Sequence, residues 1–289
     1  MGGVILQQIF NGLISGTIYV LIGLGLTFLF GVMRVLNFAH GSVVIFGSYV
    51  TLWFMTRLGI PFVVAMLAAG IVSGVVGFSL EQAMFRWVRD VPINGLIVSI
   101  GLISLFEAGL LAAFTSTPQT VPPQFTDVIV VGPISFAGQR LFVLAITLIF
   151  LGIVYFLLNR TQLGRAIRAT AQQPLAAELM GLNVNRIHAV TFAVCCMLAS
   201  FAGSLFATLF TFTPISGADI ILKAFVVVIL GGLGSLPGAI VGGLIIGLTE
   251  ALGTQFFSSD FQAAILFGIL IVVLLVRPYG IFGVQERQA

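Results

Sequence analysis

The stretch that decides the fold class has the sequence LFVLAITLIFLGIVYF and occupies residues 141–156. It is apolar on every side, whereas a strand of an outer-membrane barrel alternates in polarity over about ten residues. A helix needs roughly 20 predominantly apolar residues to cross a bilayer. We therefore predict a membrane-spanning α-helix over residues 140–158.

Comparable runs recur along the whole chain of 289 residues, which is 59% hydrophobic and 7% charged. A soluble domain carries about 25% charged residues, so the composition excludes that class. We predict an all-α fold, a polytopic transmembrane bundle of eight or nine spans that forms a single domain over residues 1–289. The predicted spans are residues 5–31, 37–56, 61–84, 94–114, 140–158, 187–212, 215–232, 236–253 and 261–277.

The distribution of basic residues predicts the orientation, because positively charged residues near the ends of spans remain in the cytoplasm. If the N-terminus is outside and each run crosses once, nine of the twelve Lys and Arg residues face the cytoplasm: Arg34, Arg86, Arg89, Arg160, Arg165, Arg168, Arg186, Arg277 and Arg287. Arg57 and Arg140 then face outward, and Lys223 lies within a span. We predict an external N-terminus and a cytoplasmic C-terminus.

Two segments are less regular. Residues 115–139 contain four prolines and are predicted to form an external, extended connection rather than a domain. The short run 215–232 contains Asp219 and Lys223, which are four residues apart and can pair on one helical face. A re-entrant half-helix is the alternative for this run, and it would move the C-terminus to the other side.

A polar segment at residues 159–188 interrupts the apolar runs and carries four of the twelve basic residues. Pro174 suits the first turn of a short helix, and Gly181 suits its end. The apolar side of this helix would consist of Leu175, Ala176, Leu179 and Met180. Such a helix on a basic stalk can dock into a groove of a soluble partner. The alternative is a solvated loop whose arginines extend toward water.

The sequence LAAELMG at residues 175–181 resembles the coupling loop of bacterial ABC importer permeases, whose pattern is Glu-Ala-Ala, three residues, then Gly. Ala176, Ala177 and Gly181 match this pattern, whereas Leu175 replaces the glutamate and Glu178 lies three positions later.

The preceding sequence, TQLGRAIRATA at residues 161–171, is similar to the same region of LivH-type branched-chain amino acid permeases. It includes Thr161, Gly164, Arg165 and Arg168.

Three further stretches resemble signatures of the same family. They are NFAHG at residues 37–41, GGLGSLPGAIVGG at 231–243 and RPYGIFG at 277–283. Together with the polar segment they occur in the family's order over essentially the whole chain. The chain is therefore identified as a member of the hydrophobic amino acid uptake permeases.

The resemblance implies a type II ABC importer in the bacterial inner membrane, in which residues 160–187 form the loop that couples to the ATPase. The implied partners are a second, homologous permease subunit that we expect to be a different chain, two cytoplasmic ATP-binding subunits, a periplasmic substrate-binding protein and membrane lipid. The implied substrates are branched-chain or related hydrophobic amino acids. Urea, short amides and other amino acids are the alternatives within the family.

The sequence assigns the energy source to another polypeptide. A P-loop needs Gly-x-x-x-x-Gly-Lys-[Ser/Thr], and the only lysine of the chain is Lys223 in ILKA. We predict a transport subunit that is not an enzyme. We also predict no cofactor, metal or nucleic acid, because metal-ligand spacings and a basic stripe with interleaved aromatics are absent. An ion-coupled secondary transporter is the alternative, but it would need several membrane carboxylates and an internal repeat. The sequence shows few such carboxylates and no convincing repeat. An intramembrane hydrolase is a further alternative, but it would need a motif such as His-Glu-x-x-His, which the sequence lacks.

Candidate residues for the translocation pathway or gate begin with Asn37, His40 and Gly41, where the second span starts. Open backbone at membrane depth is tolerated only where it is shielded from lipid, as around a cavity. His40 is predicted either to gate or contact the substrate, or to bond a neighbouring backbone group.

Gly234 and Ser235 belong to a predicted tight turn before a helix that starts near Pro237. This turn either lines the gate or is a plain connection. Glu250 is a carboxylate within a span, which is costly and usually functional or paired. It lies on a helix with several glycines, and we predict a structural or gating role facing the bundle.

Overall fold

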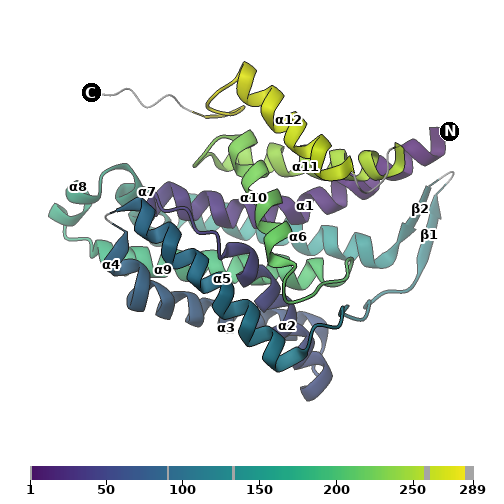
Figure 1. Cartoon of the computed structure of the whole chain (residues 1–289), viewed down its shortest axis with the longest axis horizontal. Helices are drawn as coiled ribbons and strands as arrows, with labels where there is room; N and C mark the ends of the chain where they lie inside the picture. Colours follow the sequence, from purple (N-terminus) through teal and green to yellow (C-terminus); the bar gives the residue numbers. More distant parts are fainter. Residues whose placement is uncertain (1, 90, 132–133, 257–260, 284–289) are drawn as a thin grey trace. The chain divides into compact units, whose positions relative to one another are not determined.

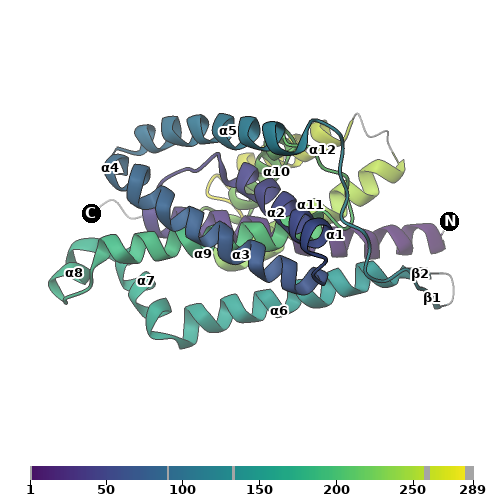
Figure 2. The ribbon, with the colours of Figure 1, turned by 90° about the horizontal axis from the view of Figure 1, so that it is seen from below.

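The computed structural model describes residues 2–89, 91–131, 134–256 and 261–283. Within these residues, nine apolar helices coincide with the nine predicted runs, and their labels appear in Figures 1 and 2. They are α1 (Gly2–Met33), α2 (His40–Leu58), α3 (Phe62–Leu80), α5 (Pro92–Phe114), α6 (Gly138–Arg160), α9 (Val184–Phe206), α10 (Gly217–Gly231), α11 (Leu236–Phe256) and α12 (Gln262–Val276). The predicted multi-span helical fold is confirmed.

Seven of the described helices are long and apolar enough to cross a membrane. The two shorter ones, α10 and α12, have 15 residues each. At 1.5 Å per residue a straight helix of that length covers about 22 Å, less than a hydrocarbon core of about 30 Å. Seven long helices and the two short ones, α10 and α12, are roughly consistent with the predicted count of eight or nine spans.

Helix α3 continues beyond Leu80 without a break. A π-helical turn, η1 (Glu81–Phe85), follows it, and one further α-helical turn, α4 (Arg86–Val88), completes the same rod. Single π turns inside α-helices are rare and often mark functional positions.

The connection at residues 115–139 contains more structure than we predicted. Strands β1 (Val128–Val131) and β2 (Ile134–Ala137) pair in antiparallel fashion, with Val128 opposite Ala137. The sequences VIVV and ISFA are rich in β-branched residues, which favour strands. The two strands are extended, as predicted, whereas their pairing with each other was not predicted.

Contacts between Cα atoms divide the chain into two units. Unit 1 comprises Met1–Thr27, Pro123–Leu148 and Leu222–Ala289, and unit 2 comprises Phe28–Pro122 and Ile149–Ile221. A single permease domain stays a prediction.

The core of unit 2 is built on α3, α9 and α2, and α3 and α9 run side by side in both ribbon views (Figures 1 and 2). A row of glycines on α3 receives side chains of α9. Gly70 faces Phe201, Gly74 faces Met197 and Gly77 faces Cys196 at distances that leave no room for a Cβ atom. Small residues allow this close packing of helices in lipid.

In unit 1, the glycine-bearing side of α11 packs against α1. A Cβ atom added to Gly247 would collide with the backbone of Gly16, and one added to Gly243 would collide with Val20. The glycine-bearing side of α11 therefore meets another helix closely.

Candidate functional site

The polar segment 159–188 folds into two helices, α7 (Gln162–Gln172) and α8 (Pro174–Leu179). The predicted basic stalk is therefore itself helical. The hydroxyl Oγ1 of Thr161 caps α7 by accepting a hydrogen bond from the N–H of Gly164 at 3.0 Å. This cap satisfies one of the backbone N–H groups that have no partner within the helix.

The sharp corner between α6 and α7 depends on Gly164 and Arg168. A Cβ atom at Gly164 would collide with the carbonyl oxygens of Leu157 and Leu158, so only glycine fits. The guanidinium of Arg168 donates to the carbonyl of Leu158. Arginine near a helix C-terminus stabilises its last carbonyls. Thr161, Gly164 and Arg168 thus shape the corner, whereas the side chain of Arg165 is exposed.

Helix α8 begins and ends where the sequence predicted. Pro174 is its first residue, and Gly181 adopts φ +84° just beyond its end. The N–H of Leu182 donates to the carbonyl of Ala177 at 3.1 Å, and the N–H of Gly181 donates to that of Glu178 at 2.9 Å. This pair of bonds is the Schellman ending, which favours glycine because it needs a left-handed residue.

The exposure of α8 separates an outward side from an inward side. Leu175, Leu179 and Met180 are 66%, 81% and 84% exposed, whereas Ala177 is 4% exposed. Ala177 therefore holds α8 against its own unit, and the apolar side chains face away from it. Figure 2 shows α8 at the tip formed by α7 and α9. Ala176 and Glu178 are exposed as well.

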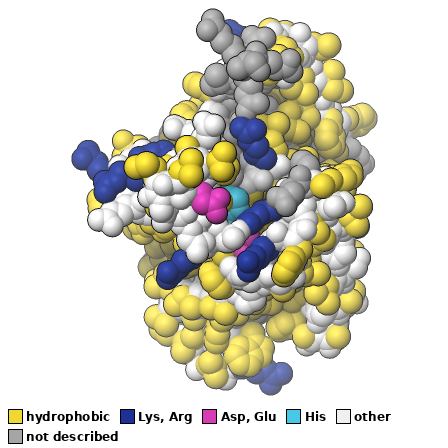
Figure 3. Space-filling model, turned by 90° about the vertical axis from the view of Figure 1, so that its left-hand side faces the viewer, with side chains coloured by type: hydrophobic (Ala, Val, Ile, Leu, Met, Phe, Trp, Pro, Cys, Tyr) yellow, Lys and Arg dark blue, Asp and Glu magenta, His cyan; other side chains and the backbone are white. Residues whose placement is uncertain are grey.

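Basic side chains surround this tip. Figure 3 views the side of the molecule on which α8 lies in Figure 1 and shows Lys and Arg side chains beside apolar ones. The exposed arginines of unit 2 are Arg34, Arg57, Arg86, Arg160, Arg165, Arg168 and Arg186. Most of them come from α4, the end of α6, α7 and the start of α9, which meet near α8.

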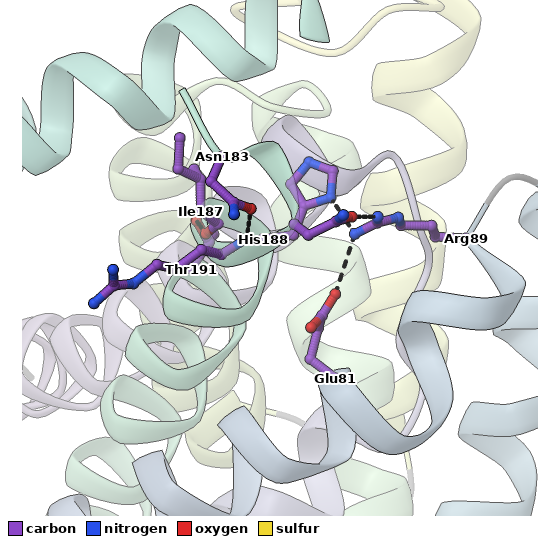
Figure 4. A network of polar contacts seen from close by, with 8 residues as sticks. Glu81, Arg89, Asn183, Ile187, His188 and Thr191 are labelled. Carbon is purple, nitrogen blue, oxygen red and sulfur yellow. Dashed lines mark hydrogen bonds and ion pairs between the residues drawn. The ribbon is translucent and has the colours of Figure 1, made fainter. Parts of the chain in front are cut away.

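A buried polar network that the sequence did not reveal lies in the same unit (Figure 4). The guanidinium of Arg89 donates to Oε1 of Glu81 at 3.2 Å, contacts Nδ1 of His188 at 2.8 Å and donates to Oδ1 of Asn185. Glu81 is a carboxylate inside the predicted span 61–84, which was the signal available in the sequence. The side chain of His188 is buried, with 7% exposed.

The candidate pathway residues at the start of α2 are buried. Asn37 is 2% exposed and His40 is 1% exposed. Oδ1 of Asn37 accepts from the N–H of Ala39 at 3.0 Å, which forms the turn into α2. A Cβ atom at Gly41 would collide with the carbonyl oxygen of Gly217, so the motif permits a close approach of the starts of α2 and α10. A role in gating stays a prediction.

Gly234 and Ser235 form the predicted turn between α10 and α11. Gly234 adopts φ +81°, and Oγ of Ser235 accepts from the N–H of Gly238 at 3.2 Å. The terminal motif closes over this turn, because the N–H of Ile281 donates to the carbonyl of Leu230 at 2.9 Å. The turn is therefore confirmed, and two of the signature stretches form one local structure.

Glu250 is paired within unit 1. Nζ of Lys223 lies 2.7 Å from Oε1 of Glu250 and 3.3 Å from the hydroxyl of Tyr19, and Nε2 of Gln262 donates to the same carboxylate oxygen. The sequence offered Asp219 as the partner of Lys223, whereas the structure gives it Glu250 on the neighbouring helix. Among the described residues, no group of His, Cys, Asp or Glu could hold a metal ion.

Comparisons with known proteins agree with this arrangement. Residues 8–275 match the family described as "Branched-chain amino acid transport system / permease component". The chain is similar to the high-affinity branched-chain amino acid transport system permease protein LivH of Escherichia coli (strain K12), with 34% identity over 97% of this chain and 96% of LivH. It is also 35% identical to BraD of Pseudomonas aeruginosa, a permease protein of the same description, with the same coverage. The corresponding permease protein LivM of Escherichia coli (strain K12) is 24% identical over 94% of this chain and 69% of LivM.

Proposed function

Because this chain belongs to the branched-chain amino acid transport permease family, we propose that it forms part of the path by which an ABC importer carries branched-chain amino acids across the bacterial inner membrane. It is a multi-pass membrane permease, and its motor is a separate pair of ATP-binding subunits. A loaded periplasmic binding protein delivers the substrate on the outer face.

The observation that carries the proposal is the exposed apolar side of α8. Leu179 and Met180 are more than four-fifths exposed at the tip of a helical projection, while a buried Ala177 and a Schellman ending fix the helix in place. A rigid helix with unpaired apolar side chains suits a groove on a soluble partner. A cytoplasmic ATPase is the partner that a permease without a P-loop requires.

The charges near α8 support a cytoplasmic position for this helix, the side on which an ATPase would dock. The basic side chains around the tip favour the cytoplasm, because Lys and Arg are retained there. With α8 proposed to be cytoplasmic, the C-terminus is proposed to lie inside, and the N-terminus and the hairpin of β1 and β2 outside.

The partner permease is proposed to be a different but homologous chain. In Escherichia coli (strain K12), LivH and LivM are both named permease proteins of a high-affinity branched-chain amino acid transport system, and this chain is similar to both. The greater similarity to LivH supports a LivH-like position for this chain in such a pair.

The test is uptake by the assembled transporter in liposomes. With its ATPase subunits, partner permease and binding protein, the chain is expected to import radiolabelled leucine only when ATP is present on the ATPase side. Urea and acetamide serve as competing substrates in parallel assays. Uptake of leucine by the isolated chain without ATP would refute the proposal, and a preference for urea would refute its substrate.

A further inference from the structure

Arg89 connects two helices of unit 2 through a single guanidinium (Figure 4). On its own rod, made of α3, η1 and α4, it pairs with Glu81. On α9, it reaches His188 and Asn185. Because arginine presents several donors in a rigid fork, it can hold acceptors on two helices at once.

The π turn η1 brings Glu81 and Arg89 onto the same side of their rod. They are eight positions apart. In a regular α-helix, with about 100° per residue, they would point about 80° apart. A π turn adds about one residue, so the pair behaves as if seven positions apart and is aligned to within about 20°. The π turn therefore places Arg89 and Glu81 on nearly the same side of the rod.

The network is largely buried, and the donors of Arg89 determine which ring nitrogen of His188 carries the proton. The side chain of Glu81 is fully buried and that of Arg89 is 16% exposed. Arginine can only donate, so Nδ1 of His188 accepts and the proton of its neutral ring is on Nε2. An ion pair of this kind is costly to break from one side, because a buried charge is then left unpaired.

The partners of Arg89 on α9 lie immediately after α8. Leu182 and Gly181 bond back to α8, and Oδ1 of Asn183 accepts from the N–H of Arg186 at 3.0 Å to cap α9. Hydrogen bonds at consecutive residues therefore connect α8 to the first two turns of α9, where Asn185 and His188 are found.

We propose that Arg89 is a positioning residue for energy coupling: it ties the α8–α9 junction to the α3 rod, so that movement of the docked ATPase is passed to both helices. The proposal rests on the proposed function, in which α8 docks an ATPase. Its physical basis is a contiguous set of hydrogen bonds and the glycine-packed contact of α3 with α9. Such continuity becomes evidence for coupling only when a perturbation along it changes the coupling.

The experiment keeps the Glu81–Arg89 ion pair and cuts the connection to α9. The double variant Asn185→Ala/His188→Phe removes both acceptors on α9. The variant Arg89→Lys keeps a positive charge for Glu81 but loses the guanidinium that contacts both helices. Ser79→Ala is the matched control, because its exposed side chain lies on the α3 rod two positions before Glu81 and outside the coupling loop.

The readout is leucine imported per ATP hydrolysed by the complete transporter in liposomes. Both test variants are expected to hydrolyse ATP but to import about tenfold less leucine per ATP, which corresponds to about 1.4 kcal/mol. Ser79→Ala is expected to match the unmodified transporter. A purely structural role would change the yield of assembled complex and leave this ratio unchanged.

Two outcomes would overturn the proposal. The first is an unchanged ratio in both test variants. The second is failure of both to assemble, because the network would then be needed for folding. Failure of the docking assignment is distinguishable, because the variant Leu179→Gln would then bind ATPase subunits normally.

Discussion

Replacing Leu179 by glutamine should weaken the attachment of the ATPase subunits. Leu179 is the last residue of α8 and is 81% exposed, so almost all of its apolar surface is available to a partner. Glutamine has nearly the same helix propensity as leucine, so the change leaves α8 intact.

The magnitude follows from the exposed surface. Complete burial of a leucine side chain is worth about 1.5–3 kcal/mol. Loss of about 2 kcal/mol would raise the Kd for the ATPase subunits about 30-fold, since each 1.4 kcal/mol is a factor of ten. ATP-dependent uptake should fall accordingly when the ATPase concentration is limiting.

The assay is binding of purified ATPase subunits to the permease pair in nanodiscs, followed by leucine uptake. Leu58→Gln is the matched control, because Leu58 is the last residue of α2 and is 57% exposed. Under the proposed topology it lies outside and should leave the Kd unchanged. The docking assignment is refuted if Leu179→Gln and Leu58→Gln bind ATPase subunits equally well.

Three further changes test the packing that supports the site. Gly164→Ala should destabilise the protein by about 1–3 kcal/mol through overpacking against two carbonyl oxygens. Gly152→Ala is the control and should be neutral or stabilising, because a Cβ atom at Gly152 would meet no atom within 4 Å. Thermal unfolding in detergent compares the two variants. Gly247→Val should prevent α11 from reaching α1, which a loss of monodisperse protein on size-exclusion chromatography would reveal, and normal elution would contradict the close contact. Lys223→Met should lower the Tm by leaving the carboxylate of Glu250, 15% exposed, without its cation, at a cost of about 2 kcal/mol after discounting for partial exposure. The double variant Lys223→Met/Glu250→Leu should recover most of that Tm, and equal loss in both would show that the pair does not matter.

The sequence by itself determined the membrane class, the nine apolar helices and the boundaries of α8. These features depend on local chemistry. A run of apolar residues has one stable state in a bilayer, and Pro174 and Gly181 act through their own backbone restrictions. The beginning of α2 at His40 and the turn before α11 were predictable for the same reason.

Only the tertiary structure decided which polar residues meet. Arg89 and His188 are 99 positions apart, and Lys223 and Glu250 are 27 apart. From the sequence, Arg89 served only to predict which side of the membrane its loop faces. Asp219 was the predicted partner of Lys223, because residue spacing can indicate pairing only within one helix. The π turn that directs Arg89 toward α9 has no sequence signature, and the glycines of α3 select α9 through surface complementarity. Such contacts depend on the three-dimensional path of the whole chain, so they could not be predicted from the order of its residues.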